Sequence, residues 1–243
     1  MRAAAARVNE CAIDDRLAAA FAGCDSVTVV DVGAFHGEWS RRVAGFLPVT
    51  RCLLIEPNPD SVRVLRSPET ELPAGAFILD VAIAEEDRGS HTLFLTKNPV
   101  GSSLRAPESG WQHEWTHVDR TSEIKTRRLD SIIKEHKISS VDVLKVDAQG
   151  CDVEVLRSAG NELRPERIQA IIVELNFRSF YVGQEPWWAT VELLMATGYS
   201  LGVMEQHFDS DGLVHWADAL FMGSATQLVG LRLRSKALWQ RPG

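Results

Sequence analysis

The chain has 243 residues, enough for one domain with a substantial core, and its 45% hydrophobic and 24% charged residues are typical of a globular protein. Its net charge of −7 argues against nucleic acid or an anionic membrane as a partner, since such partners usually bind a basic surface. No apolar run is long enough to span a bilayer, and the alanine-rich start lacks the apolar core of a signal peptide. The four cysteines show no C-x-x-C spacing, so we expect reduced thiols and a cytoplasmic protein.

Apolar, β-branched runs alternate with helical segments along most of the chain, which predicts an α/β fold with a mostly parallel sheet and helices on both faces. A first helix is expected from Asp14 to Phe21. The predicted strands are Val27–Val32, Arg51–Ile55, Ala76–Leu79, Val141–Val146 and Ala170–Glu174. The predicted helices are Glu38–Gly45, Pro59–Arg66, Leu129–Lys137, Cys151–Ala159 and Trp187–Thr197.

Two regions depart from this alternation. Between residues 85 and 128, the strand-like runs His91–Thr96 and Glu123–Leu129 flank a polar stretch, which predicts either an insertion or the edge of the sheet. After Gly198, apolar runs on either side of the Asp211-Gly212 turn signal predict a C-terminal antiparallel hairpin. We therefore expect an N-terminal helical extension at 1–24, a single domain at 25–230 with an insertion near 85–128, and a tail at 231–243.

The segment V-V-D-V-G-A-F-H-G-E-W-S (Val29–Ser40) is typical of a strand, a glycine turn and a helix N-terminus, where the backbone can approach a ligand closely. A dinucleotide fingerprint needs G-x-G-x-x-G to hold a pyrophosphate, but here Asp31 stands where the first glycine would be. An acid at this turn repels a pyrophosphate and suits a cationic ligand, which favours S-adenosylmethionine over NAD. Glu56, at the tip of the second predicted strand, is placed to accept hydrogen bonds from ribose hydroxyls.

Several short motifs, taken together, resemble the FkbM family of S-adenosylmethionine-dependent methyltransferases. They occur in family order over residues 27–223: D-V-G-A-F-H-G (Asp31–Gly37), I-E-P-N-P (Ile55–Pro59), D-V-A-I-A (Asp80–Ala84), G-S-S-L (Gly101–Leu104), R-L-D-S-I (Arg128–Ile132), L-K-V-D-A-Q-G (Leu144–Gly150), V-L-R-S-A-G (Val155–Gly160) and A-D-A-L-F (Ala217–Phe221). The resemblance implies the Rossmann-like class I methyltransferase fold, whose parallel core is closed by a terminal antiparallel hairpin.

The resemblance also implies cofactor-binding roles at the matching positions. The methionine end would lie against the glycine turn, formed by Asp31, Gly33, Ala34, His36 and Gly37. The ribose would be held by Glu56 with Pro57 and Asn58, and the adenine would be bordered by Asp80 and Val81, with Asp147 completing the set. One departure is visible, because the family usually has an acid where this chain has Gln149.

The L-K-V-D run places Lys145 and Asp147 at the C-terminal end of the fourth predicted strand, where open α/β sheets bind ligands. We expect Asp147 to act as a base or to orient an acceptor hydroxyl, and Lys145 to position or polarise the acceptor. The alternative is a structural ion pair that fixes the following helix. Glu174 and Asn176 end the fifth predicted strand on the same rim and, with Asp147, form an oxygen set that suits Mg²⁺, although nothing in the spacing requires a metal.

The literal H-E-W-T-H at His113–His117 matches a zinc-site pattern, but it lies in an irregular region and we interpret it as a chance match. Aromatic residues after the fifth predicted strand, among them Phe180 and Tyr181, belong either to the core or to an acceptor pocket. The sequence thus predicts methyl transfer from S-adenosylmethionine to a hydroxyl of a small molecule, a carbohydrate or another natural product. The rival hypotheses are an NAD-dependent oxidoreductase and a catalytically inactive cofactor-binding homologue.

Overall fold

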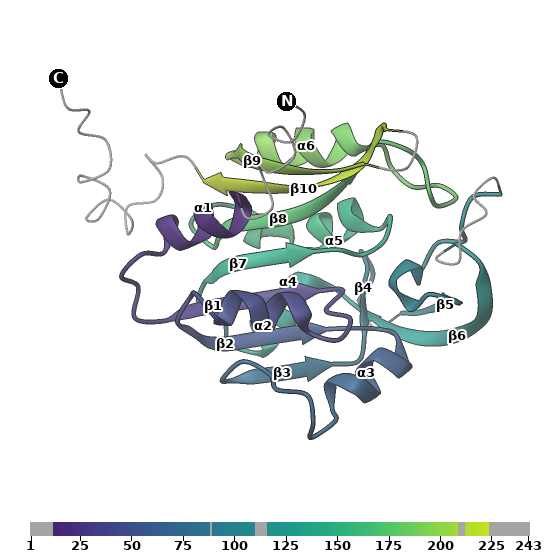
Figure 1. Ribbon diagram of the computed structural model, residues 1–243, viewed down its shortest axis with the longest axis horizontal. Helices are drawn as coiled ribbons and strands as arrows, with labels where there is room; N and C mark the ends of the chain where they lie inside the picture. The colour runs from purple at the N-terminus through teal and green to yellow at the C-terminus, as the bar shows by residue number, and fades with distance from the viewer. Residues whose placement is uncertain (1–11, 88, 110–115, 209–211, 224–243) are drawn as a thin grey trace, which may run out of the picture.

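Seven strands form the central sheet of the computed structural model, which describes residues 12–87, 89–109, 116–208 and 212–223 (Figure 1). The strand order is β3-β2-β1-β7-β8-β10-β9, with the first five strands parallel and β10 antiparallel to both of its neighbours. The strands are β1 Val27–Val32, β2 Val49–Ile55, β3 Ala76–Leu79, β7 Val141–Val146, β8 Ile168–Asn176, β9 Tyr199–Phe208 and β10 Val214–Gly223. This confirms the predicted α/β class, the mostly parallel sheet and the C-terminal hairpin.

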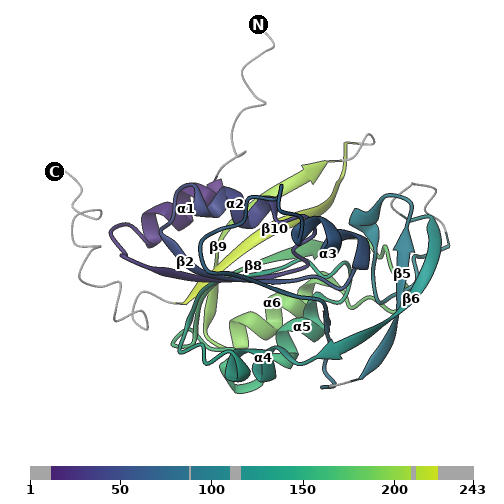
Figure 2. The ribbon, with the colours of Figure 1, turned by 90° about the horizontal axis from the view of Figure 1, so that it is seen from below.

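Helices cover both faces of this sheet (Figure 2). One face carries α1 Ala12–Ala20, α2 Glu38–Ala44 and α3 Pro59–Leu65, and the other carries α4 Leu129–Glu135, α5 Asp152–Ser158 and α6 Trp187–Ala196. Alternate residues of each parallel strand point to opposite faces, so Val29 packs in the core beneath α1 and α2, whereas Val30 packs in the core beneath α4 and α5. Burial on both faces is the reason that these strands read as continuous apolar runs.

The register of the parallel strands aligns their carboxyl ends at one edge of the sheet. Asp31 of β1 lies opposite Lys145 of β7, and Val32 lies opposite Ile55 of β2. Antiparallel pairing then brings Asp218 of β10 beside Glu174 of β8. Side chains far apart in sequence therefore meet at the edge where ligands of open α/β sheets bind.

The region that breaks the alternation forms a separate sheet of three strands in the order β4-β6-β5, rather than the edge of the main sheet. Its strands are β4 Ala82–Ile83, β5 Ser90–Thr96 and β6 Val118–Arg127, with a 3₁₀ turn, η1, at Pro99–Gly101. The prediction Glu123–Leu129 was wrong at both ends of β6. Leu129 is fully buried as the first residue of α4, and the start of β6 is mostly exposed and polar, so it gave no apolar signal.

The first helix, α1, packs on the sheet through Ile13, Leu17 and the following Phe21, all of which are buried in the core. A second 3₁₀ turn, η2, covers Gly160–Glu162. Asp211 of the predicted turn and the predicted tail 231–243 lie outside the described residues. Among the residues that the structure describes, no helix combines the length and the apolar character needed to cross a bilayer.

Candidate active site

The glycine turn after β1 brings two loops into backbone contact. Gly33 has φ 76°, its N–H donates to the carbonyl of Ile55 at 2.9 Å, and it lines a cavity at the carboxyl edge of the sheet. A Cβ on Gly33 would lie 1.9 Å from the carbonyl oxygen of Asp147, closer than any two unbonded atoms approach. Only glycine therefore permits this contact between the loops after β1 and β7.

The other predicted residues of this turn do not line the cavity. Ala34 is buried in the core, and a Cβ on Gly37 would face leucine side chains at 3.2–3.3 Å. His36 stacks on Phe35, with ring centroids 3.7 Å apart. Phe35 lines the cavity, although it was not among the predicted site residues. The φ of Phe35 is 49°, unusual for a residue with a side chain, so the turn holds Phe35 in a strained conformation.

Asp31 lies behind the cavity rather than in it. It has no exposed surface, its Oδ2 accepts a hydrogen bond from Ser40 Oγ at 2.7 Å, and its Oδ1 lies 3.8 Å from Lys145 Nζ. Burial raises the pKa of this carboxyl, although Lys145 and Ser40 oppose the shift. In the described structure Asp31 contacts Lys145 and Ser40, which links β1 to β7 and to α2.

Glu56 lies at the tip of β2 and lines the cavity with Pro57 and Asn58. Its two carboxylate oxygens accept hydrogen bonds from the N–H groups of Phe35 at 2.7 Å and Asn58 at 2.8 Å, which fixes the side chain. Burial raises the pKa of Glu56 to about 7. The Asn58 side chain accepts from Asp60 N at 3.0 Å and so caps α3.

Apolar side chains also line this first cavity, among them Val81, Ile83 and Leu93. Asp80 is exposed and forms an ion pair with Arg66 at 3.3 Å instead of lining the cavity. Among the described residues, no lysine, arginine or histidine lines it, and its ionisable carboxylates are Glu56 and Asp147. The cavity therefore presents acidic and apolar groups, a poor match for a pyrophosphate and a good one for a cationic ligand with a flat apolar part.

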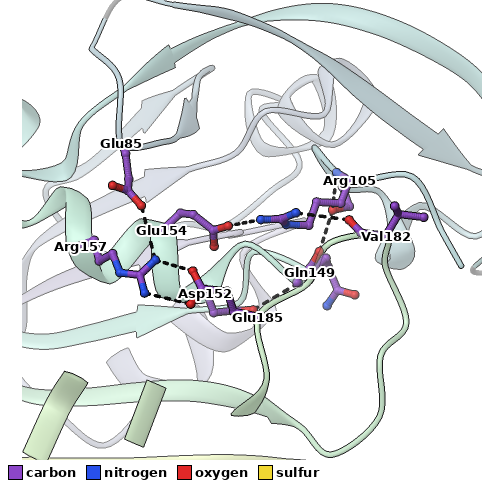
Figure 3. A network of polar contacts seen from close by, with 10 residues as sticks. Glu85, Arg105, Gln149, Asp152, Glu154, Arg157, Val182 and Glu185 are labelled. Atoms are coloured by element: carbon purple, nitrogen blue, oxygen red, sulfur yellow. Dashed lines mark hydrogen bonds and ion pairs between the residues drawn. The ribbon is translucent and has the colours of Figure 1, made fainter. Parts of the chain in front are cut away.

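Most residues of the 99–105 segment also line the first cavity. Main-chain hydrogen bonds of 2.8 and 3.1 Å join Ser103 to Phe94 of β5. Figure 3 shows Arg105 between Glu154 of α5, with which it forms a half-buried ion pair, and the carbonyl of Val182, to which it donates at 3.2 Å. The cavity encloses about 80 Å³, whereas sites for ligands of nucleoside size are on the order of 300 Å³ or more. Such a ligand thus requires the cavity to widen.

Lys145 and Asp147 form a partly buried ion pair at the end of β7. Lys145 Nζ lies 2.9 Å from Asp147 Oδ2, and Gln149 Nε2 donates to Asp147 Oδ1 at 2.7 Å. Burial alone would raise the pKa of Asp147, but the Lys145 ammonium and the Gln149 amide hold it below its ordinary value. The two neighbouring carboxylates, Asp147 and Asp31, raise the pKa of Lys145 despite its burial, so the pair remains ionised.

A second cavity of about 430 Å³ adjoins the first and shares Val100, Asp147 and Gln149 with it. The predicted rim residues Glu174 and Asn176 line this second cavity. Burial, together with nearby Asp147, raises the pKa of Glu174 well above its ordinary value. A buried carboxyl beside the ionised Asp147 thus retains its proton more readily than an exposed one.

Phe180, which the sequence analysis left between core and acceptor pocket, lines the second cavity, as does Asp218, which belongs to the quoted A-D-A-L-F motif but was given no role. His207 and Trp216 also line it, and the sequence analysis did not name them. His207 Nε2 lies 3.0 Å from Asp218 Oδ2, and this hydrogen bond raises the pKa of His207. The His207 ring stacks on Trp216, with centroids 5.5 Å apart and an angle of 16° between the planes. These residues meet through the pairing of β9 with β10, so no local motif predicts that His207 and Asp218 are partners.

The metal hypotheses gain no support from the described residues, where no group of three or more histidine, cysteine or acidic side chains is arranged to hold an ion. Residues 113–115 of the H-E-W-T-H match lie outside the described residues. Among the described residues, the cysteines at 24, 52 and 151 are free thiols. Cys151 lines the first cavity, but burial raises the pKa of its thiol to about 12, which leaves it unreactive.

Known proteins resemble the chain in sequence and in fold. It is 27% identical over 176 residues to the 2-O-methyltransferase NoeI of Sinorhizobium fredii, a match that covers 68% of this chain and 70% of NoeI. One similar solved structure is TrmK of M. capricolum with S-adenosyl-homocysteine, which has 9% identity and a TM-score of 0.47 over 86% of this chain and 68% of that one. Another is precorrin-6y C5,15-methyltransferase of Geobacter metallireducens, which has 11% identity and a TM-score of 0.44 over 86% of this chain and 87% of that one. Residues 31–208, well over half of the chain, match the model of the methyltransferase FkbM domain. The chain therefore belongs to the FkbM methyltransferase family.

Proposed function

We propose that this enzyme transfers the methyl group of S-adenosylmethionine to a hydroxyl oxygen of a small molecule, a sugar or a related natural product. The observation that carries the proposal is the first cavity, whose charged side chains among the described residues are the carboxylates Glu56 and Asp147. A sulfonium and an ammonium suit such a lining, whereas the pyrophosphate of NAD does not. The relative NoeI, whose name is that of a 2-O-methyltransferase, supports oxygen as the atom methylated.

In this proposal the cavity residues divide between binding and orientation. Glu56, fixed by two backbone donors, accepts hydrogen bonds from the ribose hydroxyls, and Val81, Ile83 and Leu93 pack against the adenine. S-adenosylmethionine supplies a methyl group on a positively charged sulfur that leaves as a neutral thioether. The carbon–sulfur bond breaks as the carbon–oxygen bond forms, so the chief tasks of the protein are alignment and removal of the hydroxyl proton.

The second cavity is the proposed acceptor site, because it meets the first at Asp147 and Gln149. Asp147 is a weak base, since its pKa is held low, and its role is to accept the hydrogen bond that orients the acceptor hydroxyl. Lys145 keeps Asp147 ionised. The His207–Asp218 pair lines the same cavity, and the imidazole is a group there whose basicity suits acceptance of the proton near neutral pH.

A calorimetric titration with S-adenosylhomocysteine, with NADH as the comparison, tests the cofactor. We expect S-adenosylhomocysteine to bind with a micromolar Kd and NADH not to bind. Tight binding of NADH without a response to S-adenosylhomocysteine would support the oxidoreductase instead. The protein is then incubated with S-adenosylmethionine carrying a labelled methyl group and a panel of methyl glycosides. Cofactor binding without transfer to any acceptor would favour the inactive homologue.

A further inference from the structure

Gln149 occupies the junction of the two cavities and lines both of them. Its φ is 49°, in the left-handed region that residues with a side chain rarely adopt, and Gly150 follows with φ 85°. Such a conformation is unfavourable for a residue with a side chain and persists only where the surroundings impose it. The contacts of Gln149 identify what imposes it.

Three segments of the chain hold Gln149. Its Nε2 donates to Asp147 Oδ1 at 2.7 Å, and its Oε1 accepts from the Tyr181 hydroxyl at 2.7 Å. Its main-chain carbonyl accepts from Ser103 Oγ at 2.6 Å, which joins it to the 99–105 segment. Backbone and side chain are therefore fixed together.

These partners determine which way the amide faces. A carboxylate only accepts, so the NH₂ group must face Asp147, and the amide oxygen then faces Tyr181. Burial raises the pKa of the Tyr181 phenol well above its ordinary value, so this hydroxyl keeps its proton and remains a donor. With Lys145 on Oδ2 and Gln149 on Oδ1, each oxygen of Asp147 has its own donor.

The surroundings of Asp147 would otherwise favour its protonation. Lys145 is the cation beside it. The acidic groups that interact with Asp147 are Asp31 of β1, Glu56 just after β2, Glu174 of β8 and Asp152 of α5. Asp218 of β10 lines the same second cavity. Nearby carboxylates raise one another's pKa. The Lys145 ammonium, which lowers the pKa of Asp147, is therefore opposed by several carboxyl groups that raise it.

We propose that Gln149 is a positioning residue of the methyl-transfer site, whose amide holds Asp147 as an oriented carboxylate where the two cavities meet. The negative charge offered to a cationic ligand then stays constant across physiological pH. The part of this inference that concerns the ligand rests on the proposed function, whereas the ionisation of Asp147 is a property of the free protein.

A ¹³C NMR titration of the aspartate carboxyl groups in the free protein tests the ionisation directly. In the wild type we expect no titration of Asp147 between pH 5 and pH 8. In Gln149→Glu, which puts a second carboxylate against Asp147, the pair should share a proton and titrate within about pH 5–8. In Gln149→Leu, which removes the donor, we expect the midpoint of Asp147 to rise by roughly one unit.

A matched control lies at the opposite edge of the sheet, where Gln169 Nε2 donates to Asp142 Oδ1, also at 2.7 Å. Gln169→Glu makes the same change beside an aspartate and should alter the titration of Asp142 while leaving Asp147 unchanged. An Asp147 signal in Gln149→Glu or Gln149→Leu that matches the wild type would overturn the inference. A signal that also shifts in Gln169→Glu would do so too, because the effect would then not depend on the contact.

Binding of S-adenosylmethionine and S-adenosylhomocysteine gives a second readout. Their ratio of affinities reports on the methylsulfonium group, since the two ligands share the ribose, the adenine and the ammonium. We expect Gln149→Leu to lose about fivefold of the wild-type preference for the sulfonium, because Asp147 stays ionised but is no longer held in one orientation. In Gln149→Glu we expect this ratio to vary with pH more steeply than in the wild type. Equal loss of both ligands, with a wild-type ratio, would indicate a merely structural role. If the wild type bound neither ligand, the proposed function would fail, and the NMR titration would still decide the inference on Gln149.

Discussion

A hydrogen bond from a glutamine amide to an aspartate occurs at both edges of the central sheet, but the pKa of the aspartate shifts in opposite directions at the two edges. At the carboxyl edge Gln149 donates to Asp147, and at the amino edge Gln169 donates to Asp142, both at 2.7 Å. The pKa of Asp147 is held below its ordinary value, whereas burial raises that of Asp142 although Thr28 N also donates to it. Lys145 is the difference, because it lies 2.9 Å from Asp147. The Lys145 cation therefore makes the larger contribution to the ionisation of Asp147, and the Gln149 donor adds to it and fixes the orientation of the carboxylate.

The largest effect on stability at the carboxyl edge is expected at Gly33. Gly33→Ala forces a Cβ against the carbonyl oxygen of Asp147 in a backbone region unsuited to alanine, and we expect a loss of roughly 3 kcal/mol or more in the free energy of unfolding. Urea denaturation measures the loss. Gly212→Ala is the control, because its φ is 75° but no atom lies within 4 Å of the added Cβ. Equal losses in both variants would mean that backbone strain alone, and not the contact between the loops, explains Gly33.

The second largest effect is expected at Glu56. Glu56→Gln removes the charge that accepts the ribose hydroxyls, and loss of a charged hydrogen bond should weaken S-adenosylhomocysteine binding about 10- to 100-fold. Asp142→Asn, which changes a buried acid at the amino edge, should leave binding within a factor of two. A similar loss in both variants would show that binding responds to general destabilisation.

The same residue predicts a pH dependence. The pKa of Glu56 is about 7 in the free protein, and its ionised form is the stronger acceptor. Binding of S-adenosylhomocysteine should therefore strengthen as the pH rises from 6 to 8, by up to roughly tenfold, and release a proton. Calorimetry in buffers of different ionisation enthalpy counts this proton. A slope that persists in Glu56→Gln would assign the dependence to another group.

The smallest effect concerns access to the first cavity. Replacing the half-buried pair with Arg105→Met and Glu154→Gln should loosen the 99–105 segment and speed association of S-adenosylhomocysteine, by up to about fivefold. Stopped-flow tryptophan fluorescence measures the rate. The control replaces Arg157 and Glu185 of the same network, which are joined by an Nη2–Oε2 contact of 2.9 Å away from residues 99–105 (Figure 3). Unchanged association in the first variant would mean that the ion pair does not limit entry.

The parallel core was predictable because its strands are short, β-branched and buried on both faces. β1, β3 and β7 have the predicted bounds, whereas β2 begins at Val49 instead of Arg51 and β8 extends over Ile168–Asn176. The three-stranded sheet was harder to predict, since much of β6 is exposed and alternates weakly. Strand prediction thus succeeded where burial on both faces left a continuous apolar run.

The candidate site was predictable only where a motif marks a strand end. Gly33, Glu56, Val81 and Asp147 all line the first cavity. The direction of a side chain at such an end is not encoded locally, since a shift of one residue reverses the face, and the sequence therefore did not reveal that Asp31 lies behind the cavity. The His207–Asp218 pair depends on the pairing of two strands, and neither residue belongs to a sequence pattern that indicates a partner.

The position of β10 has a consequence for biosynthesis. β10 lies between β8 and β9 and is hydrogen-bonded to both, so β9, although earlier in the chain, joins the sheet only through β10. A nascent chain can assemble the parallel strands while β9 still has no place in the sheet. Trp216 and Asp218, which line the second cavity, belong to β10. The second cavity is thus completed only when the ribosome has released β10, and the growing polypeptide cannot form the whole site before then.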